Sequence, residues 1–220
     1  MTIQEESAVE ASSTPRLRGP TGASLAAIIL GLLCFLAVMV LHILREEIHP
    51  LSQVMSDYAN GKNGIIMTIA FYAFGFSSMA LGFRLSWAID RRGVTKSIPL
   101  LLALGGASLI AAGVFEVERA FVPDTIEEVI HSYASMVAFV LVITSMLLFS
   151  YACRSDARWW KFRWVSATLA VIAAGAAMAS PFSADTGWSG AVQRILGLAV
   201  LSWFLLTALH VRTKPFALRD

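Results

Sequence analysis

The sequence predicts an all-α membrane protein, with six transmembrane helices and both termini in the cytoplasm. Of the 220 residues, 57% are apolar and only 15% are charged, whereas a soluble domain usually carries about 25% charged residues. The apolar residues are gathered in six long runs, and a helix needs roughly 20 apolar residues to cross the hydrocarbon core. Because backbone polar groups in lipid must be paired within the segment, these runs favour helices.

The six runs follow one another closely and leave no room for a separate soluble domain. They form one expected membrane domain, residues 22–211, preceded by a polar stretch at 1–21 and followed by a short tail at 212–220. The first stretch is rich in polar residues and is expected to be a disordered cytoplasmic tail; the last is also expected in the cytoplasm. Thr125 and Glu128 have the spacing of a capping box at a helix start. The expected helices are 24–44, 64–89, 98–117, 128–152, 163–182 and 188–211.

The orientation follows from the positions of the basic residues. Thirteen of the seventeen Lys and Arg residues lie in the two tails and in the second and fourth connections. The other side keeps only Arg45, Lys62, Arg119 and Arg194. Cytoplasmic loops carry an excess of Lys and Arg, so both termini are predicted to be cytoplasmic. Basic loops of this kind face anionic lipid, and no basic-aromatic pattern indicates a nucleic-acid partner.

A group of ionisable residues follows the first expected helix, in the stretch "HILREEIHPLSQVMSDY". If that helix continues to residue 49, the side chains of His42, Glu46 and His49 fall within about 60° of arc on one face. Such a face suits a zinc ion or another first-row divalent ion. Pro50 disfavours helical geometry at His49, so an ordinary solvated helix end is the alternative. The candidate metal ligands are His42, Glu46, His49 and His131.

Three further ionisable residues lie at comparable depth on separate helices, near their outer ends. These are Glu116, His131 and Arg194. Ionisable groups within the membrane are costly and usually face the bundle interior or a cavity. We therefore predict a polar pocket at the outer mouth of the bundle, in which Arg194 forks onto the carboxylate of Asp57 or Asp124. Its predicted members are Asp57, Asp124, His131 and Arg194, with Glu46, His49 and Glu116 nearby.

The long first outer connection is expected to fold back over the mouth of the bundle. Leu51, Val54, Met55 and Tyr58 recur at near-helical spacing. This pattern predicts a short amphipathic helix that lies on the membrane or on the bundle.

The tryptophans and cysteines are interpreted as structural residues. Cys34 and Cys153 are predicted at different depths, so a disulfide between them is not expected. The tryptophans near the expected helix ends are interpreted as interfacial anchors. They are Trp87, Trp159, Trp160, Trp164 and Trp188.

The chain resembles a known family in three segments: "HPLSQVMSDYANGKNGIIMTIAFYAFGFSSMALGF", "FVPDTIEEVIHSYASMVAF" and "GWSGAVQRILGLAV". They resemble the domain-of-unknown-function 998 family of six-helix prokaryotic integral membrane proteins, over about residues 24–210. The resemblance implies the fold and a prokaryotic plasma membrane, but no activity, cofactor or oligomeric state. The end of the third helix, "GVFEVERAFVPD", is longer and more acidic than the family's form. The matching positions are the Ser56-Asp57 pair, Pro123-Asp124, His131 and Arg194.

Three functional hypotheses stay open. In the first, the outer pocket binds a small-molecule ligand or lipid headgroup, or takes part in transport. In the second, the chain is a membrane-embedded hydrolase, with or without a metal, that uses His131 and His49 with Asp57 or Asp124 as metal ligands or acid-base groups. The third hypothesis is a b-type haem protein with His42 and His131 as axial ligands. The sequence contains no GxGxxG, HExxH, CxxC or GxSxG motif, and no paired broken helices of the transporter kind.

Overall fold

The computed structural model describes residues 21–88, 93–115, 125–155 and 159–213. Within them are six helices long and apolar enough to cross a membrane, and no strand. The predicted all-α six-helix architecture is confirmed, with helix ends within three residues of those expected. The predicted tails lie outside the described residues, apart from a few residues at the ends of the first and last helices. The helices are α2 (Thr21–Leu44), α3 (Gly64–Ala88), α4 (Ile98–Val114), α5 (Ile126–Ala152), α6 (Phe162–Ser183) and α7 (Ser189–Thr213).

Short 3-10 turns join the long helices. The predicted cap of α5 is present, since the backbone N–H of Glu128 donates to Thr125 Oγ1 at 3.3 Å. This bond satisfies one of the N–H groups that a helix start leaves unpaired. The short turns are η1 (Met55–Ala59), η2 (Gly93–Ser97), η3 (Cys153–Ser155) and η4 (Ala184–Thr186).

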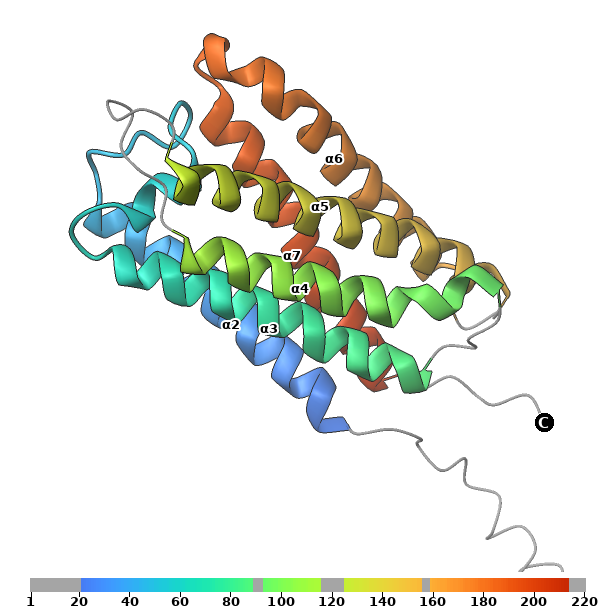
Figure 1. The fold of residues 1–220 in the computed structure, drawn as a ribbon. Helices are drawn as coiled ribbons and strands as arrows, with labels where there is room; N and C mark the ends of the chain where they lie inside the picture. The colour runs from blue at the N-terminus through green and yellow to red at the C-terminus, as the bar shows by residue number, and fades with distance from the viewer. Residues whose placement is uncertain (1–20, 89–92, 116–124, 156–158, 214–220) are drawn as a thin grey trace, which may run out of the picture.

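The six helices lie side by side as an elongated bundle (Figure 1). Each packs against its neighbour along the chain, and α7 closes the bundle by packing against α2. Small residues let α3 and α4 approach closely. A Cβ atom at Gly75 would lie 2.6 Å from the carbonyl oxygen of Gly106, and a Cβ at Gly106 would meet the carbonyl of Gly75. Small residues are the usual means of close helix packing in lipid.

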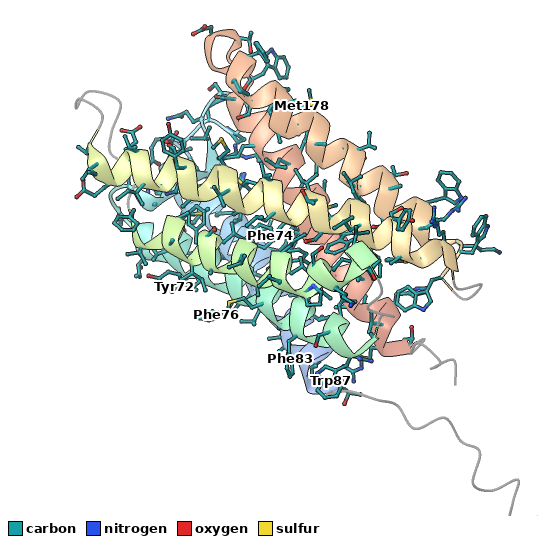
Figure 2. The ribbon with its side chains drawn as sticks, turned by 45° about the vertical axis from the view of Figure 1, so that its right-hand side comes forward. Tyr72, Phe74, Phe76, Phe83, Trp87 and Met178 are labelled. Carbon is teal, nitrogen blue, oxygen red and sulfur yellow. The ribbon has the colours of Figure 1, made fainter. Side chains whose placement is uncertain are left out.

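The outer surface of the bundle is apolar, as a lipid-facing surface must be. Figure 2 labels Phe83, Trp87 and Met178, which are 54%, 53% and 75% exposed, and Phe74, which is buried. Of the tryptophans interpreted as anchors, Trp87, Trp160, Trp164 and Trp188 are exposed.

The interpretation of Trp159 as an interfacial anchor is wrong. This residue is fully buried and packs edge-on against Phe149 and Phe162 and close to His210. An indole in such an aromatic cluster gains more from packing than from the membrane interface.

Cysteine labelling tests the predicted orientation of the bundle. Cys34 and Cys153 are both buried, and both are first replaced by serine so that neither reacts. Cysteines are then introduced as Asn60→Cys and Ala157→Cys in separate variants. We expect a membrane-impermeant maleimide to label residue 60 in intact cells, and residue 157 only after the membrane is opened. Labelling of both positions from the same side would contradict the predicted topology.

Candidate functional site

The connection between α2 and α3, residues 45–63, lies against the start of α7, and we call this end of the molecule the loop end. The backbone N–H of Ala191 donates to the carbonyl of Leu51 at 2.9 Å. The hydroxyl of Ser189 donates to the carbonyl of Ser52 at 2.5 Å. These bonds pair N–H and O–H groups at the start of α7 that its own helix leaves unpaired.

A glycine permits this contact between the loop and α7. A Cβ atom at Gly190 would lie 2.5 Å from the carbonyl oxygen of Pro50 and would also meet that of Gln53. One turn further along α7, the side-chain carbonyl of Gln193 accepts the backbone N–H of Met55. The loop is therefore held over the first two turns of α7.

The loop does contain a short helix, η1, but it is a 3-10 helix that begins at Met55, so Leu51 and Val54 of the predicted pattern lie outside it. The ring of Tyr58 is fully buried under the loop, whereas Leu51 is 47% exposed. The loop thus covers the bundle with part of the predicted apolar pattern and leaves the rest at the surface.

Arg45 anchors the second half of the loop. Its side chain is buried, and Nη1 donates to the carbonyls of Asn60 at 2.7 Å, Lys62 at 2.8 Å and Tyr58 at 3.3 Å. Its Nε forms an ion pair with the exposed carboxylate of Glu47. One guanidinium therefore gathers three carbonyl groups that would otherwise lose their hydrogen bonds on burial.

Arg194 joins α7, the loop and α2. Its Nε donates to His42 Nε2 at 3.0 Å, and its Nη1 donates to the carbonyls of Gln53 at 2.8 Å and Gly190 at 3.0 Å. Its Nη2 donates to the Tyr58 hydroxyl oxygen at 3.3 Å. All four acceptors are neutral. A guanidinium has five N–H donors, so the described residues leave one Nη2 hydrogen without an acceptor.

The bond from Arg194 fixes the state of His42. A guanidinium can only donate, so His42 Nε2 must accept and Nδ1 must carry the ring hydrogen. Nδ1 then donates to the carbonyl of Val38 at 2.7 Å. His42 is therefore neutral in this arrangement, and both of its ring nitrogens are engaged.

His131 lies in the second turn of α5 and caps the end of α4. Its Nδ1 is 2.7 Å from the carbonyl oxygen of Ala112 and 3.1 Å from that of Phe115. Phe71 packs edge-on against the imidazole, with ring centroids 5.5 Å apart. Since carbonyls only accept, Nδ1 carries the hydrogen and Nε2 is the ring nitrogen left for another partner.

His42, His131 and Arg194 line one cavity of about 140 Å³ in the interior of the bundle. Its walls come from α2, α3, α4, α5, α7 and η1. The ionisable and amide side chains lie at the loop end. The deeper wall is formed by Cys34, Phe74, Leu109, Phe139 and Leu201.

The structure thus brings His131 and Arg194 to one site, and among the described residues no carboxylate forms an ion pair with Arg194. Asp57 lies in η1, and no ion pair joins it to Arg194 in the described residues. Asp124 and Glu116, the other predicted acids, lie outside the described residues. Arg194 is instead held by neutral acceptors.

The predicted metal-binding face does not form. α2 ends at Leu44, so Glu46 and His49 do not continue its helical face, and both side chains are exposed. Pro50 disfavours helix at His49, and the inward turn of Arg45 completes the break. No three His, Cys, Asp or Glu side chains among the described residues are grouped to hold a metal ion. The occupied nitrogens of His42 likewise give no support to axial haem ligation.

Sequence reasoning missed three residues of the site. Arg45, Tyr58 and Gln193 position the loop that covers the cavity. Gln193 offered a signal, because an amide inside an apolar helix needs a partner. The carbonyl acceptors of Arg45 and the hydrogen-bond donor to Tyr58 are not sequence neighbours of these residues, so no local sequence pattern predicts them.

Asp57 gives this site a pH dependence. Partial burial raises the pKa of its carboxyl, and the backbone at Val54 and the charge of Arg194 oppose that rise. A raised folded-state pKa means that the folded protein binds the proton more tightly. The contribution to stability is then full below the ordinary value of 3.8 and is lost as pH rises through the raised value.

The variant Asp57→Asn tests this pH dependence. It should be more stable than the wild type near neutral pH, by less than about 1 kcal/mol because the group is partly exposed. The difference should shrink as pH falls below the raised pKa. Unfolding free energies of both proteins between pH 3 and 7 measure it, and a difference that grows towards acid would contradict the assignment.

Residues 28–210 match the model of the family described as "Protein of unknown function (DUF998)". The chain belongs to this family. The match extends from α2 to α7 and includes every residue of the cavity. Comparisons with curated proteins and with solved structures found no match. The DUF998 protein is thus an integral membrane protein of a family without an assigned activity.

Proposed function

We propose that this DUF998 protein binds the anionic group of a small-molecule ligand or lipid headgroup in the cavity at the loop end. The observation that carries the proposal is the arrangement of Arg194. Four of its five N–H donors are held by neutral acceptors, and the side chain lines the cavity. A fixed guanidinium with one donor left over suits an anionic oxygen.

The charge balance of the site supports an anionic ligand. Among the described residues the one ion pair is Arg45–Glu47, and Asp57, whose pKa burial raises and the charge of Arg194 lowers, does not form an ion pair with it. An unpaired charge in an apolar cavity is costly, and an anionic ligand would offset that cost. Ligand sites are typically apolar cavities with a few convergent polar groups, and this cavity has that character.

The alternative of a hydrolase receives no comparable support. Ser56 and Ser135 line the cavity with His131, but no hydrogen bond within the described residues joins either hydroxyl to the imidazole. A serine nucleophile needs an adjacent base to activate it. We therefore favour binding over hydrolysis.

Titration with two single-chain lipids tests the proposal. The protein is placed in nanodiscs of phosphatidylcholine and titrated with lysophosphatidic acid, which is anionic, and with the monoacylglycerol of the same acyl chain, which has no phosphate. Charge-assisted hydrogen bonds contribute about 1.5–3 kcal/mol, so the anionic probe should bind at least about tenfold more tightly. The variant Arg194→Gln should lose this preference.

Lys62→Gln is the matched control, since it removes an exposed positive charge from the same loop end without touching the cavity. It should keep the wild-type preference for the anionic probe. Equal binding of lysophosphatidic acid and the monoacylglycerol by the wild type, or equal loss of preference in both variants, would overturn the proposal.

A further inference from the structure

We infer that the ligand of this cavity is a single-chain anionic amphiphile that enters from the bilayer. Its headgroup lies at Arg194 and its acyl chain lies in the deeper part of the cavity. This inference rests on the proposed function and adds the chemical class of the ligand and its route.

The shape of the cavity argues for a chain. Cys34 lies eight residues deeper than His42, and Phe139 lies eight residues deeper than His131. At 1.5 Å per residue, the cavity therefore extends about 12 Å below its polar groups. The deep wall consists of apolar side chains and one thiol. A polar ligand without a chain would leave this part unfilled.

The volume of the cavity restricts the ligand to one chain. The volume is about 140 Å³, and an engineered cavity of about 150 Å³ is filled by benzene. Together with the depth, this volume describes a narrow channel that takes one run of methylene groups. The two chains of a diacyl lipid do not fit inside together.

The cavity is covered on the loop side and reaches the surface of the bundle laterally. Met55 and Ser56 of η1 form its cover, and η1 is held to α7 by Gln193. The lining residues Phe35 and Met39 of α2 and Leu198 of α7 are 37%, 38% and 52% exposed. They lie within helices that cross the membrane, so this side of the cavity faces lipid, and an amphiphile can enter there without leaving the bilayer.

The polar end selects the headgroup. Arg194 offers an N–H donor, and His131 offers Nε2, because its Nδ1 donates to the carbonyls of Ala112 and Phe115. A headgroup with an anionic oxygen and a nearby hydroxyl matches this pair. A lysophospholipid has both groups, since its phosphate supplies the anionic oxygen and its glycerol supplies the hydroxyl.

Three probes that share a phosphate group but differ in their number of acyl chains measure the contribution of the chain to binding separately from that of the charge. Glycerol 3-phosphate carries no chain, lysophosphatidic acid carries one and phosphatidic acid carries two. In phosphatidylcholine nanodiscs, the affinity for lysophosphatidic acid, referred to its concentration in the bilayer, should rise with acyl length, but by less than the roughly fourfold per methylene that transfer from water would give, because the chain enters from lipid. It should level off once the channel is filled. Glycerol 3-phosphate and phosphatidic acid should both bind at least about tenfold more weakly.

The variant Cys34→Phe fills the deep end of the cavity and tests the place of the chain. It should abolish the dependence on acyl length, while glycerol 3-phosphate still binds as in the wild type. Leu36→Phe is the matched control on the exposed face of the same helix and should behave as the wild type. Both variants share the partitioning of the probes into the bilayer, so the comparison removes that contribution.

The two proposals fail in different ways. If Arg194→Gln retains the preference for the anionic lysolipid, the proposed function is wrong. If Arg194 governs binding but glycerol 3-phosphate or phosphatidic acid binds as tightly as lysophosphatidic acid, the inference of a single chain is wrong. An unchanged dependence on acyl length in Cys34→Phe would overturn it as well.

Discussion

Replacing Arg194 with glutamine is expected to destabilise the protein by about 2–4 kcal/mol. The side chain makes four hydrogen bonds to α2, the loop and α7, and bonds to a charged donor each contribute about 1.5–3 kcal/mol. Partial exposure of the guanidinium reduces the sum. Thermal unfolding in one detergent measures the loss, and amide exchange should show residues 50–58 opening before the helices.

Arg194→Lys separates charge from geometry. Lysine keeps the positive charge but lacks the planar fork that reaches acceptors on three segments. We expect it to be destabilised nearly as much as Arg194→Gln. Full stability of the lysine variant would show that the charge alone matters and that the hydrogen bonds do not hold the loop.

Replacing Arg45 with glutamine is expected to release the second half of the loop. The carbonyls of Tyr58, Asn60 and Lys62 would lose their shared donor, and an unsatisfied buried polar group costs about 1–3 kcal/mol. Amide exchange at residues 56–62 should accelerate by at least about tenfold. Exchange in the middle of α3 should stay slow, because the bundle does not depend on this contact.

Glu47→Gln is the control for Arg45. It removes the ion pair but leaves the three carbonyl bonds, and the carboxylate is exposed. Exposed ion pairs contribute little to stability, so amide exchange in the loop should change only slightly. Equal acceleration in both variants would mean that the ion pair holds the loop, not the carbonyl bonds.

The helices of this protein are determined by its local sequence. Each span is a run of apolar residues long enough to cross a bilayer, and that property needs no knowledge of distant residues. The same holds for the cap at Thr125, whose partner is three residues away. For His131 and Arg194, the cost of a charge in lipid predicted that both face the interior, and both line the cavity.

The partners of these residues were decided by the tertiary structure. The sequence predicted Asp57 or Asp124 as the partner of Arg194, and among the described residues, which do not include Asp124, its acceptors are His42, Gln53, Gly190 and Tyr58. A hydrogen bond depends on distance and direction to within a few tenths of an ångström. The position of a loop carbonyl is fixed only when the whole loop has docked.

The metal-binding face predicted at His42, Glu46 and His49 does not form, because it needed α2 to continue to residue 49. Helical spacing places side chains on one face only while the helix continues, and α2 ends at Leu44. The sequence alone therefore determined the six spans and the inward orientation of His131 and Arg194, because solvation in lipid acts on each segment separately. The loop that covers the cavity and the neutral acceptors of Arg194 could be identified only from the tertiary structure. They depend on contacts between residues more than a hundred positions apart in the chain.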